Sequence, residues 1–312
     1  MTGKKFGQIS GEALRAVGAT GLRALRLDED DIDEATAARR IAAAVGGECV
    51  ELTGDPVEGS QKLTATSRGL LRVDVARLHA VNSVPTVGVF SRYDNLPVDE
   101  GDVVAHAKVG PLAVPAAAVE SVERIAMAGP TLDVIPFSPH TVRLLNLEAL
   151  PATWAVRFES QFRERIAWFG GDLMPIRHLA GADVQAVRDA IGDARRACTD
   201  VLLITGTRST DPLDEGRLGV LAAGATLVRE GLPAHPGSTY WVASLEGVPV
   251  IGIASCGTLS DSTALDLLLP RVFAGLPVDA DYLASLGHGG MLTSEMQFRF
   301  PKYLRRSRRG EV

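Results

Sequence analysis

The sequence predicts an α/β protein: a three-layer domain built on a mostly parallel sheet with a β-hairpin, and a smaller N-terminal α+β domain. Three observations lead to this fold class. From Thr141 onward, strand-like and helix-like segments alternate. Two apolar segments flank Glu246-Gly247, which is typical of a tight antiparallel hairpin. Before Pro136 the segments are shorter and are divided by proline and glycine. The 312 residues are enough for two hydrophobic cores.

The alternating part of the chain predicts strands at 142–147, 172–177, 201–204 and 226–229, with a helix in each gap. The first helix has large apolar side chains spaced by three or four residues, which indicates a core-facing stripe. These are Trp154, Phe158, Phe162, Ile166 and Phe169. The second helix repeats this pattern from Val184 to Cys198, and the third ends near Gly224. This order predicts parallel strands covered by helices on both faces.

The remaining elements are less regular. Hairpin strands are expected at 240–245 and 248–253, followed by a loop and a helix whose inward residues include Leu265 and Val272. The N-terminal part predicts helices at 11–17, 31–45 and 116–128, and strands at 22–27, 70–75, 86–91 and 101–109. We place the domain boundaries at 1–136, 137–280 and 281–312, the last being an extension with a basic tail.

Composition limits the classes of function. No apolar run is long enough to cross a bilayer, and the N-terminus does not have the pattern of a secretory signal. The three cysteines lie far apart, which argues against a disulfide framework or zinc site and predicts a cytoplasmic protein. With a net charge of −6, we expect the chain to bind neither DNA nor a membrane. The basic tail after Arg299 is either a solvated terminus or a contact for RNA or an acidic protein.

The first candidate loop follows the apolar strand at 201–204. Its residues are Thr205, Gly206, Thr207, Arg208 and Ser209. A parallel strand that ends in such a loop leaves backbone N–H groups at the carboxyl edge of the sheet, where open α/β sheets bind phosphate. Asp211 and Asp214 follow as candidate catalytic carboxylates. Asp214 is either a magnesium ligand or a helix cap, and Asp211 either contacts ligand or stabilises a turn.

The second candidate loop, 254–260, leaves the second hairpin strand and precedes a helix. Its candidate binding residues are Ser255, Cys256, Gly257 and Ser260. Cys256 has no base near it in sequence, so we expect a small packing residue rather than a nucleophile. If both strands belong to one sheet, both loops open at the same edge and form a shared anion pocket.

These motifs, in this order, resemble a known family. The run from Val142 to Gly275 resembles the molybdopterin-binding domain of molybdopterin adenylyltransferases and molybdenum insertases. The first loop with Asp214, the proline-glycine turn that includes Gly237, and the glycine-containing stretch 252–257 match its pattern. Gly69-Leu70-Leu71-Arg72-Val73-Asp74 and Leu286-Gly287-His288-Gly289-Gly290 are similar to the bacterial module often fused to a molybdenum-cofactor cytidylyltransferase.

The resemblance implies that the chain binds molybdopterin or the molybdenum cofactor, with the phosphate between the two loops and Mg²⁺ at Asp214. It also implies a homo-oligomer, with a nucleotide co-substrate if the chain is a nucleotidyltransferase and delivery to a maturing molybdoenzyme if it is a carrier. Two departures leave the activity open: Thr207 and Arg208 replace small residues, and Ala254-Ser255 replaces Pro-Gly. These side chains either fill the pocket or, for Arg208, add a phosphate contact. An enzyme of nucleotidyl transfer or molybdenum insertion, a non-catalytic carrier, and an interaction protein with a degenerate pocket all remain alternatives.

Overall fold

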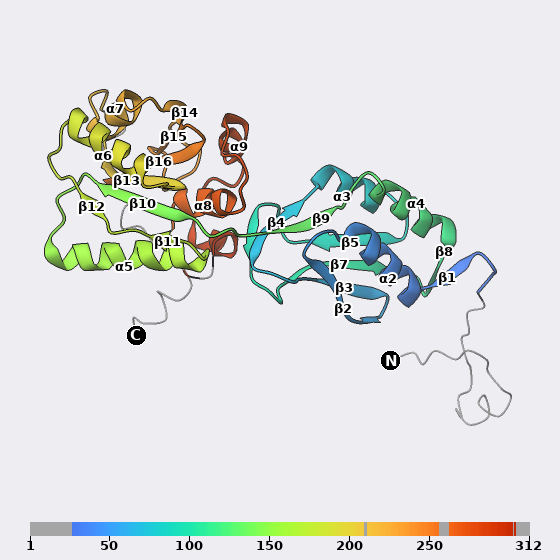
Figure 1. Ribbon diagram of the computed structural model, residues 1–312. Coiled ribbons are helices and arrows are strands. Elements are labelled where there is room, and N and C mark those ends of the chain that lie inside the picture. The colour runs from blue at the N-terminus through green and yellow to red at the C-terminus, as the bar shows by residue number, and fades with distance from the viewer. Residues whose placement is uncertain (1–26, 209–210, 256–261, 302, 304–312) are drawn as a thin grey trace.

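The computed structural model describes residues 27–208, 211–255, 262–301 and 303 and shows a mixed α/β chain in two lobes (Figure 1). The helix expected at 11–17 and nearly all of the strand expected at 22–27 lie outside these residues. The last strand of the first lobe ends at Pro136. A short connection then leads to Thr141, where the second lobe begins.

The first lobe contains a four-stranded and a three-stranded antiparallel sheet, with the order β2-β3-β7-β5 and β6-β4-β9. A short β1-β8 pair adjoins them. Its strands are β1 (Asp31–Asp33), β2 (Val50–Val57), β3 (Ser60–Ala65), β4 (Gly69–Val73), β5 (Val87–Ser91), β6 (Leu96–Val98), β7 (Val103–Val109), β8 (Ala113–Pro115) and β9 (Leu132–Pro136). Its helices are α2 (Glu34–Val45), α3 (Val75–Asn82) and α4 (Ala116–Ala126).

One helix boundary in this lobe differs from expectation. The helix predicted at 31–45 begins at Glu34, because Asp33 caps it: its carboxylate accepts hydrogen bonds from Ala35 N and Thr36 N. The three residues from Asp31 form β1 instead.

The second lobe is built on one sheet with the strand order β11-β10-β13-β16-β15-β14, and β12 also pairs with β10. Its strands are β10 (Thr141–Asn146), β11 (Asp172–Leu173), β12 (Arg177–His178), β13 (Val201–Thr207), β14 (Thr226–Glu230), β15 (Trp241–Leu245) and β16 (Val248–Ala254). Its helices are α5 (Ala152–Trp168), α6 (Val184–Arg196), α7 (Glu215–Ala222), α8 (Leu265–Phe273), α9 (Ala280–Ser285) and the 3₁₀ helix η2 (Ser294–Arg299).

The sheet is parallel from β11 to β16 and antiparallel beyond it. The hairpin β15–β16 forms as expected. Two strand predictions need correction. The strand expected at 172–177 is two short pieces, β11 and β12, that both pair with β10. Strand β14 joins the edge through antiparallel pairing with β15, because the hairpin lies between it and the parallel strands.

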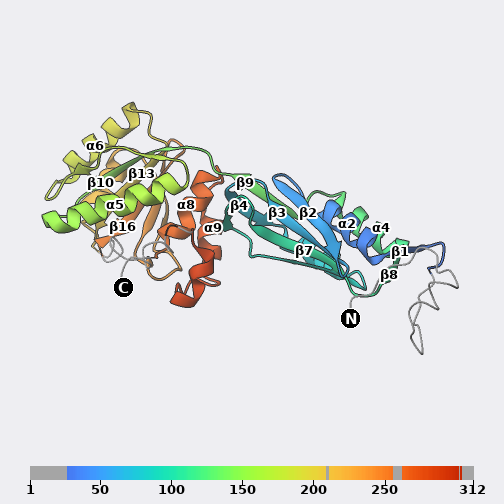
Figure 2. The same ribbon diagram turned by 90° about the horizontal axis from the view of Figure 1, so that it is seen from below.

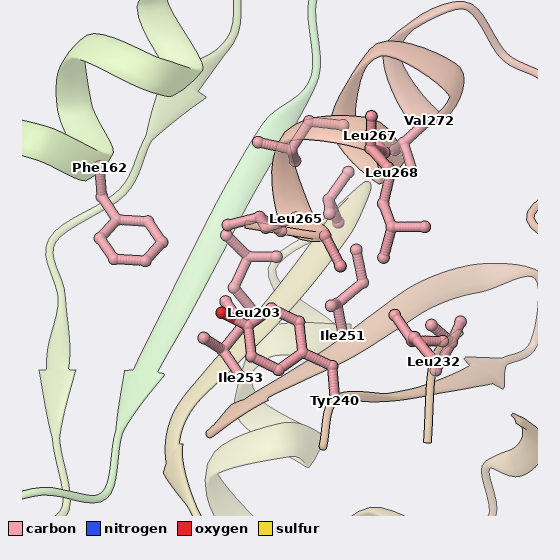
Figure 3. Close-up of a cluster of buried hydrophobic side chains, with 14 of the residues drawn as sticks. Phe162, Leu203, Leu232, Tyr240, Ile251, Ile253, Leu265, Leu267, Leu268 and Val272 are labelled. Atoms are coloured by element: carbon pink, nitrogen blue, oxygen red, sulfur yellow. The ribbon is translucent and has the colours of Figure 1, made fainter. Parts of the chain in front are cut away.

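Side chains along the central strands alternate between two apolar clusters. Leu203 and Ile251 contribute to the cluster that also contains residues of α5 and α8 (Figure 3), whereas Leu202 and Ile204 contribute to the cluster formed with α6 and α7. The predicted stripe of α5 is buried at Phe158, Phe162, Ile166 and Phe169. The prediction is wrong at Trp154, which is 53% exposed.

Direct contacts join the two lobes where α8 lies beside β4 (Figure 2). The Arg68 guanidinium lies 4.9 Å from the ring centroid of Trp168 and donates a 3.0 Å hydrogen bond to its carbonyl oxygen. Arg271 Nη1 of α8 donates to Asn95 Oδ1 at 3.1 Å. These contacts restrain the orientation of one lobe against the other.

Candidate functional site

The carboxyl ends of β10, β13 and β16 lie side by side at one edge of the second-lobe sheet. Asn146 pairs with Thr205, and Thr207 pairs with Ala254 after a bulge in β13. Both candidate loops therefore leave neighbouring parallel strands at the same edge. We call this edge, with the loop residues described on it, the loop edge.

A hydrogen-bonded polar cluster lies beneath the first loop. Thr205 is fully buried and its Oγ1 donates to Asn146 Oδ1 at 3.0 Å. Asn146, also fully buried, donates through Nδ2 to the Glu148 carbonyl oxygen at 2.7 Å and lies 3.2 Å from His178 Nδ1. Thr205 is thus part of the strand and of its support, not of a free loop. The sequence analysis missed Asn146, although a polar residue within an apolar strand is a signal for such a role.

Gly206 has the positive φ that glycine favours, +78°. A Cβ atom built there would lie 2.8 Å from both the backbone N and the Cβ of Glu148. We expected a phosphate to approach the backbone closely at Gly206. The chain's own segment after β10 occupies that position instead. Thr207, next in sequence, is also buried.

Asp214 is buried and caps α7. Its Oδ1 accepts from Arg217 N at 2.7 Å, and its Oδ2 accepts from Arg208 N. The carboxylate therefore links the first turn of α7 to Arg208 of the first loop. Asp211 accepts from Leu213 N at 2.9 Å, the local turn contact that was the alternative to a ligand role.

The carboxylates that follow the first loop interact with Arg208, a cation of the same chain. Arg208 forms an ion pair and a hydrogen bond with Glu215. This hydrogen bond is the main cause that raises the pKa of Arg208, and the charges of Asp211 and Asp214 add to the rise. The same contact lowers the pKa of Glu215. No group of three or more His, Cys, Asp or Glu side chains suited to a metal occurs in the described parts of the chain. A magnesium ion at Asp214 stays a prediction, and we derive no step through it.

Arg208 remains accessible at this edge. Its side chain is 59% exposed and that of Glu215 37%. Exposed ion pairs of this kind contribute little to stability, about 0–1 kcal/mol. An arriving phosphate group can therefore replace Glu215 as the partner of the guanidinium at low cost.

The structure describes the beginning of the second loop and the residues that precede α8. Ser255 is exposed directly after β16. Gly237 has φ +117°, and a Cβ atom there would lie 2.6 Å from Ala264 Cβ; Pro236 O accepts from Ala264 N at 2.8 Å. The proline-glycine turn therefore packs against the residue that precedes α8. The candidates Ser209, Cys256, Gly257 and Ser260 lie outside the described residues.

Two cavities lie away from the loop edge. One of about 1190 Å³ is in the first lobe, between the ends of α2 and α4 and strand β9. The other, of about 270 Å³, lies beside α6. None of the described residues of the two candidate loops lines either one.

Replacing Asp214 with alanine is expected to lower the free energy of unfolding by about 2–3 kcal/mol, because two backbone N–H groups lose their acceptor in a buried place. Asp183→Ala is the matched control, since Asp183 caps α6 through one bond, to Ala186 N, at an exposed position. We expect about 1 kcal/mol there. Urea unfolding measures both, and equal losses would show that the bond to Arg208 N contributes nothing.

No known protein family matches the chain, and no curated protein matches it. Among solved structures, it is similar to the molybdopterin biosynthesis protein MoeA from Pyrococcus horikosii. The identity is 14%, the match covers 78% of this chain and 74% of that one, and the TM-score is 0.33. A second match, to a deletion mutant of NadC, has 12% identity, covers 53% of this chain and 61% of that one, and has a TM-score of 0.18. Both TM-scores are below 0.5, so neither match establishes a shared fold. No helix within the described ranges is long and apolar enough to cross a membrane.

Proposed function

We propose that the chain binds molybdopterin or the molybdenum cofactor at the loop edge. The observation that carries the proposal is the pairing of Thr207 with Ala254, which starts both candidate loops at adjacent positions. The ordered motifs of the sequence supply the identity of the ligand, since the same sequence of loop, turn, hairpin and loop is found in molybdopterin-binding domains. The proposal includes the three-layer fold of those domains, a cytoplasmic location and a homo-oligomer.

Arg208 is the residue that we propose to hold the ligand's phosphate. A guanidinium group binds phosphate through paired, charge-assisted hydrogen bonds. Arg208 lies at the exposed end of β13 and is held by an exchangeable partner, Glu215. Exposed Ser255, at the start of the second loop, is proposed to contact the pterin side of the ligand.

Two observations favour a carrier over an enzyme. Both oxygens of Asp214, the carboxylate that nucleotidyl transfer would need, accept hydrogen bonds from the backbone. The space next to Gly206 is filled by Glu148. These contacts favour binding and delivery to a maturing molybdoenzyme without a chemical step. An enzyme of nucleotidyl transfer or molybdenum insertion is the second candidate.

Binding is tested with the purified full chain. The protein is denatured, the extract is oxidised, and pterin fluorescence is measured; in parallel, added molybdopterin is titrated into the protein. We expect a saturable interaction that Arg208→Gln weakens about tenfold, the loss of a charge-assisted contact. Arg163→Gln is the matched control, because Arg163 is 54% exposed and pairs with Glu159 on α5. Absence of pterin in the extract together with no binding of added molybdopterin contradicts the proposal.

The carrier and the enzyme are separated by a second assay. The chain is incubated with molybdopterin and Mg-ATP or Mg-CTP, and pyrophosphate is measured. Binding without pyrophosphate release is expected for the carrier. Release that depends on the pterin substrate and is lost in Asp214→Asn would instead establish nucleotidyl transfer.

A further inference from the structure

The cavity of about 270 Å³ beside α6 lies at the edge of the sheet opposite the loop edge. It is bordered by the second half of α6, by Ala223 after α7, and by Leu245 at the end of β15. Leu245 pairs with Val248, the first residue of β16, whereas the second loop follows the last residue of that strand. The cavity is therefore separate from the site proposed above, and an inference drawn from it stands independently.

Arginine supplies most of the charged side chains that line this cavity. Arg188, Arg195 and Arg196 line it together with one carboxylate, that of Asp189, in a chain whose net charge is −6. Among the described residues Arg188 has no ion pair, and its Nη1 lies 3.5 Å from Gln185 Oε1, at the limit of a hydrogen bond. Asp189 already accepts a 2.9 Å hydrogen bond from Gln185 Nε2.

The other two arginines have partners that can be exchanged. Arg195 pairs with Glu246 of the hairpin turn, and Arg196 pairs with Asp193. All four side chains of these pairs are at least half exposed. Ion pairs in such places contribute little to stability, so a stronger anionic ligand can displace the carboxylates. Arg195 and Arg196 also stabilise the C-terminal end of α6, but Arg188 lies too far from that end to share this role.

Gly192 keeps the space between the arginines open. It is four residues after Arg188 and three before Arg195, so the three positions share one face of the helix. A Cβ atom at Gly192 would lie 3.4 Å from Arg196 Nη1 and, apart from its chain neighbours and the backbone of its own helix, within 4 Å of no other atom. Packing therefore does not require glycine here, although glycine inside a helix is less stable than alanine. The glycine leaves a hollow whose apolar floor is formed by Ile191 and Leu245, both buried.

We propose that this hollow is a binding site for a small phosphate monoester. The guanidinium groups of Arg188 and Arg195 bind the phosphate oxygens, which match their paired N–H geometry. The organic group attached to the phosphate lies over Ile191 and Leu245. The volume of about 270 Å³ lies just below the usual range of ligand sites, about 300–1,000 Å³, which restricts the ligand to a small molecule.

The probe is phenyl phosphate, titrated into the full chain at low ionic strength and followed by NMR shifts of the α6 backbone amides. We expect saturable binding with a Kd of about 1 mM or tighter. Inorganic phosphate, which lacks the apolar group, and phenol, which lacks the charge, are expected to bind at least fivefold more weakly. Arg188→Gln is expected to weaken phenyl phosphate binding at least tenfold, and Gly192→Leu, which fills the hollow, to abolish it.

Arg157→Gln is the control for charge alone. Arg157 is an exposed residue of α5 with no ion pair in the described parts of the chain, like Arg188. It is expected to leave binding unchanged. The proposal is overturned if Arg157→Gln and Arg188→Gln weaken binding equally, if inorganic phosphate binds as tightly as phenyl phosphate, or if no saturation occurs. Because Arg188 is exposed, its variant tests the site even if Gly192→Leu fails to fold.

Discussion

Replacing Asp266 with alanine is expected to lower the free energy of unfolding of the second lobe by about 3–5 kcal/mol, the cost of breaking a buried ion pair from one side. Asp266 is fully buried and accepts from Arg165 Nε at 3.0 Å and from the Tyr303 hydroxyl at 2.6 Å. Its other oxygen accepts from Thr263 N at 2.8 Å. The substitution removes all three contacts and leaves the guanidinium of Arg165 buried without its carboxylate.

The protonation of this cluster follows from the same geometry. Burial by itself disfavours the charge on Arg165, but the attraction and hydrogen bond of Asp266, together with the effects of Tyr303 and Tyr240, outweigh it, and the pKa of Arg165 is raised. Burial, together with the nearby carboxylate, raises the pKa of Tyr303 well above its usual value. In the intact cluster Tyr303 therefore stays a neutral hydrogen-bond donor and Arg165 stays charged.

Urea unfolding followed by tryptophan fluorescence measures the effect, because all three tryptophans, Trp154, Trp168 and Trp241, belong to the second lobe. Glu246→Gln is the control: it removes a carboxylate from an exposed pair with Arg195 and is expected to cost about 0–1 kcal/mol. Tyr303→Phe, which keeps the ion pair, is expected to cost about 1–2 kcal/mol. If Asp266→Ala costs no more than Glu246→Gln, the ion pair does not stabilise the lobe.

Replacing Gly206 with alanine is expected to cost about 2–4 kcal/mol, for two separate reasons. The backbone has φ +78°, where a side chain costs roughly 1–2 kcal/mol. The new Cβ atom would also lie 2.8 Å from the backbone N of Glu148, so the segment after β10 must move, at about 1–3 kcal/mol. Because Glu148 O is the acceptor for Asn146 Nδ2, this movement also disturbs the polar cluster under the first loop.

Gly170→Ala separates the two reasons. Gly170 has nearly the same backbone angle, φ +80°, but a Cβ atom there would have no other atom within 4 Å. Its substitution is expected to show only the backbone cost, about 1–2 kcal/mol. Urea unfolding of both variants gives the contribution of the contact with Glu148 as their difference, and a difference near zero would mean that the segment shifts freely.

The second lobe was more predictable from sequence than the first, and the reason is the length of its apolar runs. The strand around Val201 is apolar throughout because both of its faces are covered, and the hairpin around Gly247 has a strong turn signal. In the first lobe, β2 contains Gly54 and Pro56 and exposes most of its residues, so it has no clear alternation, and the prediction passed over both β2 and β3. Their pairing is long-range information that no short window contains.

The loop edge was predictable in its position but not in its internal contacts. That two loops share one edge follows from the parallel order of β13 and β16. The support of Thr205 by Asn146 does not follow, because the two residues are 59 positions apart and meet only through the register of β10 and β13. The pairing of Arg208 with Glu215 could not be predicted from the sequence either. It depends on a turn that is closed by the hydrogen bond from Arg208 N to Asp214.

The hydrogen bond from Thr263 N to Asp266 also affects how the second loop can be engineered. One end of this loop is fixed by the pairing of β16 with β13, and the other is anchored in the core through Asp266. The span to be bridged is therefore set by the scaffold, independently of what the intervening sequence is. Libraries that vary the sequence between Ser255 and Ser262 can thus be inserted between two fixed ends.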